Sequence, residues 1–316
     1  MGKDFKILLY ENMHSEGTAL LAESCDLIYA RSFAEEDIID QVADVDAIII
    51  RANGAVSEKV MAAAPKLKVV GRHGVGLDAF DLDADRQRGI KVVYTPQANK
   101  ESVAEHFVAL ALMLAKKIRP ADIALRDCRW QARYELIGTE LRGKTLGVLG
   151  FGRIGQQTAR ICKNGFAMPI LYYDQLAVPD VERELEALRV EEKALFEQAD
   201  FISVNLPLVS ETRHFVNADL LNLMKPTAFL INMARGPIWN EADVTEALRT
   251  HQIAGAGSDV YEVEPVTADN PLLKLDNFVG TPHMSAHTEE AMTRMSMVAR
   301  DVLAVLEGRE PEFPAV

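Results

Sequence analysis

The sequence has 316 residues, which is long enough for two domains of ordinary size, each with its own hydrophobic core. Hydrophobic residues make up 48% of the chain and charged residues 26%, the balance of a globular protein in water. The formal net charge of −13 at pH 7 disfavours general binding to nucleic acids or anionic membranes, because both need a basic surface. We therefore expect neither as a partner.

The cysteines Cys25, Cys128 and Cys162 lie far apart in the sequence and form no CxxC pair. This spacing disfavours both a disulfide framework and a zinc site, so we expect no metal and a reducing compartment. The N-terminus lacks the long apolar core and the cleavage signature of a secretion signal. The expected location is the cytoplasm.

The first third of the chain alternates short apolar runs with segments rich in helix formers. The predicted strands are Ile7–Tyr10, Leu27–Tyr29, Ala47–Ile50, Val69–Val70 and Val92–Tyr94. The predicted helices are Ser15–Glu23, Ala34–Val42, Ser57–Ala64 and Asp83–Arg88. Strands regularly separated by helices predict an α/β domain around a parallel sheet.

A turn-rich break at residues 95–99 precedes a long apolar segment. We predict one helix over Glu101–Ile118 that ends at Pro120, and we place a domain crossing at its start. Its apolar face is consistent with a subunit interface and equally with internal core.

The stretch from Leu146 to Asp174 is the most informative part of the sequence. An apolar strand leads into the glycine fingerprint of residues 150–155, GFGRIG, which opens a helix. Gly150 permits a tight turn, Gly152 lets the backbone approach a pyrophosphate, and Gly155 lets helix and strand pack closely. The helix start directs unpaired N–H groups and a positive dipole end at the phosphates. The pattern predicts a dinucleotide-binding Rossmann domain.

Asp174 ends the next strand, 19 positions after the last glycine of the fingerprint. A carboxylate there can hydrogen-bond both hydroxyls of an adenosine ribose. The following residue is Gln175 rather than an arginine, so nothing at this position favours a 2′-phosphate. We therefore predict NAD as the cofactor in preference to NADP.

Further strands are predicted at Phe201–Asn205, Ala228–Asn232, Ile253–Ser258 and Phe278–Gly280, followed by one final helix, Glu289–Glu307, stopped by Gly308. The predicted fold is α/β, with two doubly wound parallel-sheet domains. A Rossmann NAD-binding domain of residues 99–284 is inserted into a flavodoxin-like substrate domain of residues 1–98 and 285–316.

Three chemically useful side chains follow strands of the second domain: Arg235, Glu264 and His283. An arginine can bind a substrate carboxylate with two parallel hydrogen bonds. A histidine can take or return a hydroxyl proton near neutral pH, and a glutamate bound to it would fix its tautomer and favour the imidazolium. Seen alone, an arginine at such a position more often forms a surface ion pair, and a glutamate or histidine there is more often an ordinary loop residue. Their joint placement behind an NAD fingerprint favours hydride exchange with a 2-hydroxy acid.

The chain resembles the D-isomer-specific 2-hydroxyacid dehydrogenases, most closely the phosphoglycerate dehydrogenase branch. The motifs that carry the resemblance are VVGRHGVGLDAFD (69–81), TPQANKESVAEH (95–106), GTELRGKTLGVLGFGRIG (138–155), NLPL (205–208), NMARG (232–236), SDVYEVEP (258–265) and TPH (281–283). They span nearly the whole chain, and we expect no feedback control of the kind that a C-terminal regulatory domain gives many phosphoglycerate enzymes.

The resemblance implies a role for each of several residues. It implies that Arg235, Glu264 and His283 form a catalytic triad. Backbone N–H groups of Val75 and Gly76 are implied to bind the substrate carboxylate. The residues implied to contact NAD, beside the glycines, are Arg153, Ile154, Asp174, Thr212 and Asp259. The family also implies a homodimer in which the cofactor domains pair.

The sequence is compatible with more than one substrate. Arginines at the positions of Arg51 and Arg72 help bind phosphate in the phosphoglycerate enzymes, so a small 2-hydroxy acid with a second anionic group, whether phosphate, sulfonate or carboxylate, is favoured. Alternatively, these arginines pair with acids such as Asp46 or Asp78. Ser285 stands where the family commonly has glycine, and His73 replaces a small residue. The competing interpretations are a glyoxylate/hydroxypyruvate reductase and, from another class, an NAD(H)-sensing protein related to corepressors.

Overall fold

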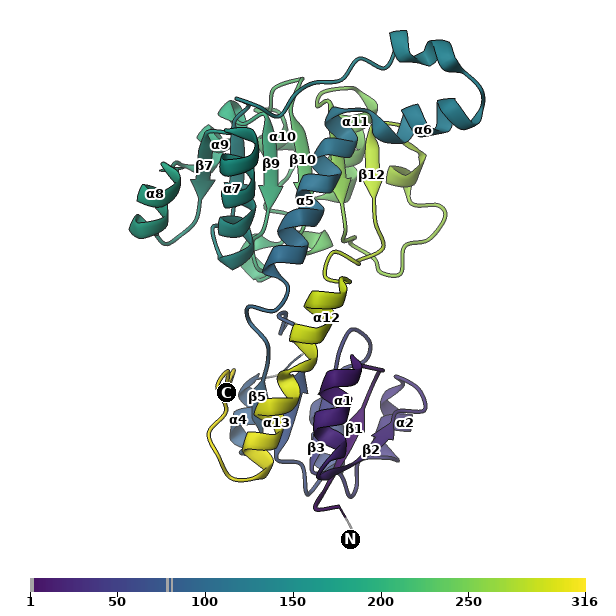
Figure 1. Ribbon diagram of the computed structural model, residues 1–316, viewed down its shortest axis with the longest axis vertical. Coiled ribbons are helices and arrows are strands. Elements are labelled where there is room, and N and C mark those ends of the chain that lie inside the picture. The colour runs from purple at the N-terminus through teal and green to yellow at the C-terminus, as the bar shows by residue number, and fades with distance from the viewer. Residues whose placement is uncertain (1–2, 78–79, 81) are drawn as a thin grey trace. The chain divides into compact units, whose positions relative to one another are not determined.

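The computed structural model describes residues 3–77, 80 and 82–316. The chain divides into two compact units (Figure 1). Unit 1 comprises Met1–Asn99 and His287–Val316, and unit 2 comprises Lys100–Ala286. The domain boundaries expected from the sequence differ from these by one or two residues.

Unit 1 is built on a five-stranded parallel sheet. Its strands are β1 (Phe5–Leu9), β2 (Cys25–Tyr29), β3 (Ala47–Ile50), β4 (Val69–Arg72) and β5 (Lys91–Val93), in the order β2-β1-β3-β4-β5. This is the flavodoxin-like order. The helices between them are α1 (Ser15–Ala22), α2 (Glu35–Ile39), α3 (Glu58–Ala63) and α4 (Leu82–Gln87). The predicted strands lie within two residues of those in the structure.

The C-terminal segment returns to unit 1 as two helices, α12 (Glu289–Ser296) and α13 (Val298–Leu306). The prediction of one continuous helix was wrong, because the Met297 N–H bonds to the Arg294 carbonyl three residues back and tightens the chain there. Buried side chains continue on both sides of the break, so the apolar period conceals it. Gly308, with φ +75°, follows the second helix, as predicted.

Unit 2 is built on a seven-stranded parallel sheet. Its strands are β6 (Leu146–Leu149), β7 (Ile170–Tyr173), β8 (Leu188–Arg189), β9 (Phe201–Val204), β10 (Phe229–Asn232), β11 (Gly255–Ser258) and β12 (Phe278–Gly280). Their order is β12-β11-β10-β9-β6-β7-β8. This is the Rossmann order: the strands from β6 to β8 follow one another toward one edge of the sheet, and those from β9 to β12 follow one another toward the other edge. The predicted fold class of two parallel-sheet α/β domains is confirmed.

Helices cover both faces of this sheet. The helices of unit 2 are α5 (Lys100–Ala115), α6 (Ile118–Arg126), α7 (Arg153–Phe166), α8 (Pro179–Leu185), α9 (Glu192–Gln198), α10 (Ala218–Leu221) and α11 (Glu241–Arg249), with short 3-10 turns η1 (Trp130–Tyr134), η2 (Ser210–Thr212), η3 (Gly236–Ile238) and η4 (Pro271–Lys274). Alternate residues of one strand enter opposite cores: Phe229 and Ile231 join one and Leu230 the other. Figure 1 shows α5 and α7 side by side on one face.

The long apolar segment after residue 100 forms two helices instead of one. Helix α5 ends at Ala115, and Lys117 turns the chain with φ +52°. Pro120 lies in the first turn of α6, where an N–H group would have no partner within the helix. The proline therefore fits the start of this helix and does not mark the end of the preceding one. Phe107 and Leu110 are buried in the core, which shows that the apolar face of α5 is internal.

Candidate active site

Three glycines shape the turn between β6 and α7. Gly150 has φ +93°, and a Cβ on it would lie 2.8 Å from the Asn205 carbonyl carbon. A Cβ on Gly155 would lie 2.3 Å from the Gly150 carbonyl oxygen. At Gly152, by contrast, no described atom beyond its chain neighbours lies within 4 Å of that position. The first and third glycines therefore pack against protein, and the second keeps its side open for a ligand.

The helix that follows suits a phosphate group. Helix α7 begins at Arg153, and its N-cap residue Gly152 has no side chain to bond the N–H groups of the first turn. Such N–H groups, together with the helix dipole, bind phosphate oxygens well. Arg153 and Ile154 therefore lie where a dinucleotide pyrophosphate is expected.

Asp174 is held beside the glycine turn by its own hydrogen bonds. Its Oδ2 accepts the Phe151 N–H at 2.7 Å, and its Oδ1 accepts the Leu176 N–H at 3.1 Å. Arg189 of β8, which sequence reasoning missed, donates to the Asp174 carbonyl oxygen at 2.9 Å. The carboxylate is thus placed at the end of β7, where its negative charge opposes a 2′-phosphate.

Thr212 lies in the loop after β9. Its hydroxyl donates to the Pro207 carbonyl at 2.6 Å and accepts the Val209 N–H at 2.9 Å. The side chain closes the loop onto itself.

Arg235 follows β10 in a turn folded by the buried Asn232. The Asn232 side chain accepts the Ala234 N–H at 3.0 Å and donates to the Arg235 carbonyl at 2.9 Å. A Cβ on the next residue, Gly236, would lie 1.9 Å from the Tyr261 carbonyl carbon. Only glycine therefore permits the Arg235 turn to lie against the loop that follows β11.

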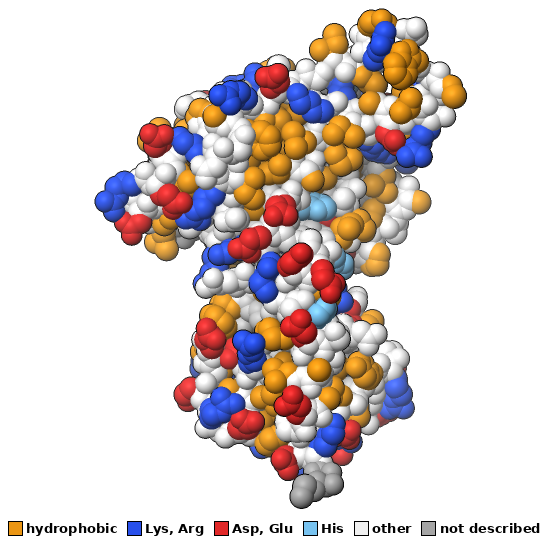
Figure 2. Space-filling model, viewed as in Figure 1, with side chains coloured by type: hydrophobic (Ala, Val, Ile, Leu, Met, Phe, Trp, Pro, Cys, Tyr) orange, Lys and Arg blue, Asp and Glu red, His pale blue; other side chains and the backbone are white. Residues whose placement is uncertain are grey.

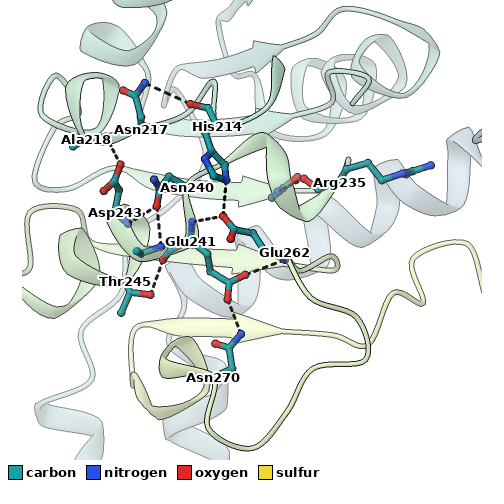
Figure 3. A network of polar contacts seen from close by, with 12 residues as sticks. His214, Asn217, Ala218, Arg235, Asn240, Glu241, Asp243, Thr245, Glu262 and Asn270 are labelled. Atoms are coloured by element: carbon teal, nitrogen blue, oxygen red, sulfur yellow. Dashed lines mark hydrogen bonds and ion pairs between the residues drawn. The ribbon is translucent and has the colours of Figure 1, made fainter. Parts of the chain in front are cut away.

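A polar network fixes that loop to the start of α11 (Figure 3). Glu262 Oε1 accepts the Glu241 N–H at 2.9 Å and lies 3.1 Å from His214 Nε2. Glu241 in turn accepts the Glu262 N–H at 3.2 Å and the Asn270 amide at 2.6 Å. In Figure 3 the Arg235 side chain extends away from this network. The sequence offered no signal for this polar network, because its residues lie far apart in the chain.

Glu264 and His283 form a hydrogen-bonded pair. His283 Nδ1 lies 2.7 Å from Glu264 Oε2, and Glu264 Oε1 accepts the Tyr261 N–H at 2.9 Å. Burial acts to raise the pKa of Glu264, but the bonds from His283 and Tyr261 and the charges of His283 and Arg235 outweigh it and lower that pKa. Because Nδ1 faces a carboxylate, it carries a proton, and Nε2 is the nitrogen left for a substrate.

Asp259 follows β11 and is completely buried. Its carboxylate accepts hydrogen bonds from the loop that carries His283, including the Met284 N–H at 2.9 Å. Ser285, the departure from the family pattern, is 8% exposed and donates its N–H to the same carboxylate at 2.8 Å.

Arg51 and Arg72 lie at adjacent strand ends in unit 1, since Ile50 of β3 pairs with Arg72 of β4. Arg51 Nη2 lies 3.0 Å from His287 Nε2. The alternative pairing of Arg51 with Asp46 is wrong, because the two residues stand at opposite ends of β3, where the Asp46 carboxylate accepts the Lys6 N–H and lies 3.9 Å from Lys68 Nζ. The other acid proposed for such pairing, Asp78, lies outside the described residues.

The loop after β4 contains His73, Val75 and Gly76. His73 is 2% exposed, and neither ring nitrogen has a hydrogen-bond partner among the described residues. Burial, followed by the charges of Arg51 and Arg72, lowers the pKa of His73 to about 4. This imidazole is therefore uncharged at neutral pH. Val75 and Gly76 are partly buried.

In the described part of the chain, no group of three or more histidine, cysteine or acidic side chains is placed to hold a metal ion. The three cysteines are free thiols. Within the same residues, no helix has the length and apolar character needed to cross a lipid bilayer.

The comparison with protein families matches residues 108–285 to the model described as "D-isomer specific 2-hydroxyacid dehydrogenase, NAD binding domain". A D-3-phosphoglycerate dehydrogenase of Methanocaldococcus jannaschii is 39% identical over 309 residues, which cover 97% of this chain and 58% of that protein. A glyoxylate reductase of Thermofilum pendens is 38% identical over 315 residues, covering 97% of this chain and 93% of that protein. The chain thus spans little more than half the length of the first relative and nearly all of the second.

Among solved structures, the TT0316 protein from Thermus thermophilus is similar with a TM-score of 0.92 at 33% identity, covering 98% of this chain and 100% of that one. The family match covers more than half of the chain and includes the glycine turn, Arg235, Glu264 and His283. The chain therefore belongs to the D-isomer-specific 2-hydroxyacid dehydrogenase family, with unit 2 as its NAD-binding domain.

Proposed function

We propose that this protein is an NAD-dependent oxidoreductase that transfers hydride between the nicotinamide and a 2-hydroxy acid or its 2-oxo acid. The observation that carries the proposal is the 2.7 Å pair of His283 and Glu264 in the same unit as the glycine turn. Arg235 follows the strand next to the one that precedes Glu264. A cation, a carboxylate and an imidazole thus follow three neighbouring strands, β10, β11 and β12.

Each of these residues has one role in the proposed reaction. The bound cofactor supplies or accepts the hydride. His283 Nε2 takes the hydroxyl proton in oxidation and returns it in reduction. Glu264 holds the imidazole in one tautomer and stabilises its protonated form. Arg235 binds the substrate carboxylate through its planar guanidinium group.

The residues proposed to hold NAD belong to unit 2. The glycines Gly150, Gly152 and Gly155 with Arg153 and Ile154 bind the pyrophosphate. Asp174 binds the ribose hydroxyls, for which a carboxylate at this position is suited. Thr212 and Asp259 are proposed to lie near the cofactor, as their counterparts do in the family.

We further propose that the substrate carries a second anionic group. Two arginines at adjacent strand ends, Arg51 and Arg72, supply charge for it, and the N–H groups of Val75 and Gly76 bind the carboxylate. The candidates are 3-phosphoglycerate and a sulfonate such as sulfolactate. The second candidate function, reduction of glyoxylate or hydroxypyruvate, is supported by the Thermofilum relative, of which the chain covers 93%.

The first experiment measures NADH formation at alkaline pH with D and L forms of 3-phosphoglycerate, sulfolactate, malate, glycerate and lactate. A doubly anionic acid is expected to exceed the others in kcat/KM by tenfold or more, which corresponds to about 1.4 kcal/mol of discrimination. The Arg51→Ala variant should remove that preference. A preference for glycerate or lactate would contradict the second-anion proposal and favour the reductase.

We also propose that the protein is a homodimer in the cytoplasm. Exposed apolar side chains gather on the segment of residues 118–137, which runs through α6 and η1 (Figures 1 and 2). They are Ile118, Ile123, Leu125, Trp130, Tyr134 and Ile137, of which Ile137 is 76% exposed. A cluster of this kind on a monomer commonly marks a protein interface. The three free thiols agree with a reducing compartment.

A further inference from the structure

The loop that carries His283 is held by one buried carboxylate. Asp259 has no exposed surface, and its two oxygens accept three hydrogen bonds from residues 281–285. The donors are Thr281 Oγ1 at 2.6 Å, the Met284 N–H at 2.9 Å and the Ser285 N–H at 2.8 Å. The Asp259 carbonyl also accepts the His283 N–H at 2.8 Å. The catalytic loop is therefore built around this side chain.

His106, on helix α5, completes the arrangement from the other side. Its Nε2 lies 2.9 Å from Thr281 Oγ1 and 3.9 Å from Asp259 Oδ1. The threonine hydroxyl has a single proton, which it donates to Asp259, so it must accept the bond that it makes with His106. His106 therefore carries a proton on Nε2. The bonds run in one direction, from imidazole to hydroxyl to carboxylate.

The same helix holds the other end of the loop. Ser102 Oγ donates to the Ser285 carbonyl at 2.5 Å. Helix α5 is 16 residues long, and the buried Phe107 and Leu110 anchor it in the core of unit 2. A rigid element thus contacts both ends of the catalytic loop.

The loop needs this support, because His283 has φ +50°. A residue with a side chain rarely adopts the left-handed region unless its surroundings impose it. Here the conformation directs Nδ1 at Glu264, 2.7 Å away. Loss of the loop's attachments would let His283 relax to a commoner backbone conformation and leave that pair.

We propose that His106 and Thr281 are positioning residues, which hold the Asp259 carboxylate and through it the orientation of His283. The proposal deepens the proposed function, since it rests on His283 as the proton donor and acceptor. Neither His106 nor Thr281 is proposed to touch substrate or cofactor, and both oxygens of the buried Asp259 carboxylate are bonded to the loop of residues 281–285. Their effect is expected in turnover rather than in cofactor affinity.

Thr281→Val tests the proposal with little change in volume. It removes the hydroxyl that links His106 to Asp259, and we expect kcat to fall at least tenfold while the KM for NADH stays within threefold. Thr281→Ser keeps the hydroxyl and should restore most of the turnover. His106→Leu should reproduce the loss and His106→Gln, which can donate to Thr281, should recover part of it. Thr245→Val, which removes a hydroxyl bonded to the Glu241 carbonyl on α11, is the matched control.

A second readout does not depend on turnover. The imidazole proton shared between His283 and Glu264 should give a downfield ¹H resonance, identified by its absence in His283→Gln. In Thr281→Val this resonance should shift or broaden, and in Thr281→Ser it should be retained. If the wild-type protein oxidises no acid, the proposed function fails while the resonance still tests the positioning.

Two results would overturn the inference. One is a folded Thr281→Val variant with wild-type kcat and an unchanged resonance. The other is a variant that keeps kcat but loses affinity for NADH, which would assign the hydrogen-bonded chain to cofactor binding. Thermal unfolding of each variant shows whether it is folded at the assay temperature.

Discussion

At the scale of single residues, His283 combines an unusual backbone with an ordinary side-chain contact. Its φ of +50° would be costly in isolation, and its imidazole is bonded to Glu264 at 2.7 Å. Strained residues of this kind persist where the surrounding structure imposes them, commonly at functional sites. The chemistry of the site therefore depends on one side chain whose position is set by its loop.

Replacing His283 should separate chemistry from binding. His283→Gln keeps a polar side chain but cannot exchange a proton near neutral pH, so kcat should fall by about 10²–10⁴-fold. NADH affinity, measured by fluorescence titration, should stay nearly unchanged. His251→Gln is the matched control, because His251 is exposed and also has a left-handed backbone, with φ +55°. Undiminished turnover in His283→Gln would refute the triad assignment.

Asp174 should decide the choice between the two nicotinamide dinucleotides. Asp174→Ala removes the acceptor proposed for the ribose hydroxyls, and a hydrogen bond to a charged group contributes about 1.5–3 kcal/mol. We expect the KM for NAD to rise roughly tenfold or more and the relative use of NADP to improve. Asp180→Ala, on the exposed start of α8, is the control. An unaltered cofactor preference would show that Asp174 does not bind the ribose.

At the scale of secondary-structure elements, the turn between β6 and α7 is constrained by packing inside unit 2. Gly155 lies so close to the start of the turn that a Cβ would meet the Gly150 carbonyl oxygen at 2.3 Å and Val148 Cγ1 at 2.9 Å. Gly165 lies in the same helix, is exposed, and has no described neighbour within 4 Å of its Cβ position beyond the helix and its chain neighbours. Two glycines of one helix thus serve different purposes.

Alanine substitutions should have opposite effects at these two positions. Gly155→Ala forces backbone atoms apart and should destabilise the protein by about 1–3 kcal/mol or more, with loss of NAD binding. Gly165→Ala relieves the entropic cost of a helical glycine and should stabilise it by up to about 1 kcal/mol. Denaturant unfolding measures both changes. Equal stability of the two variants would contradict the packing account.

At the scale of the whole molecule, the exposed apolar segment of residues 118–137 is the feature that predicts assembly. The double variant Leu125→Glu/Ile137→Glu should shift the sedimentation coefficient from that of a dimer to that of a monomer, because burying two carboxylates is unfavourable. Leu188→Glu replaces a side chain that is 60% exposed on the edge strand β8 and should leave the dimer intact. A wild-type protein that sediments as a monomer at every concentration would refute the proposal.

Local patterns in the sequence were sufficient for the fold class. The alternation of apolar runs and helical segments predicted the strands of both sheets within two residues, except for the short edge strand β8. The fingerprint of residues 150–155 was readable because its glycines, strand and helix are consecutive in the chain. The breaks at Lys117 and Met297 were not readable, since apolar residues of helical period continue across them.

The sequence by itself determined that the chain has two parallel α/β sheets, a glycine turn for a dinucleotide, and reactive residues directly after strands. Only the tertiary structure decided which of these residues touch. It set the contact between His283 Nδ1 and Glu264 Oε2, a pairing that the family resemblance had implied, and it placed Gly236 against Tyr261. It also directed the Asp259 carboxylate into the loop that carries His283. The physical reason is that strand order and close packing bring together residues far apart in the chain, whereas sequence periodicity reports only neighbours within one element.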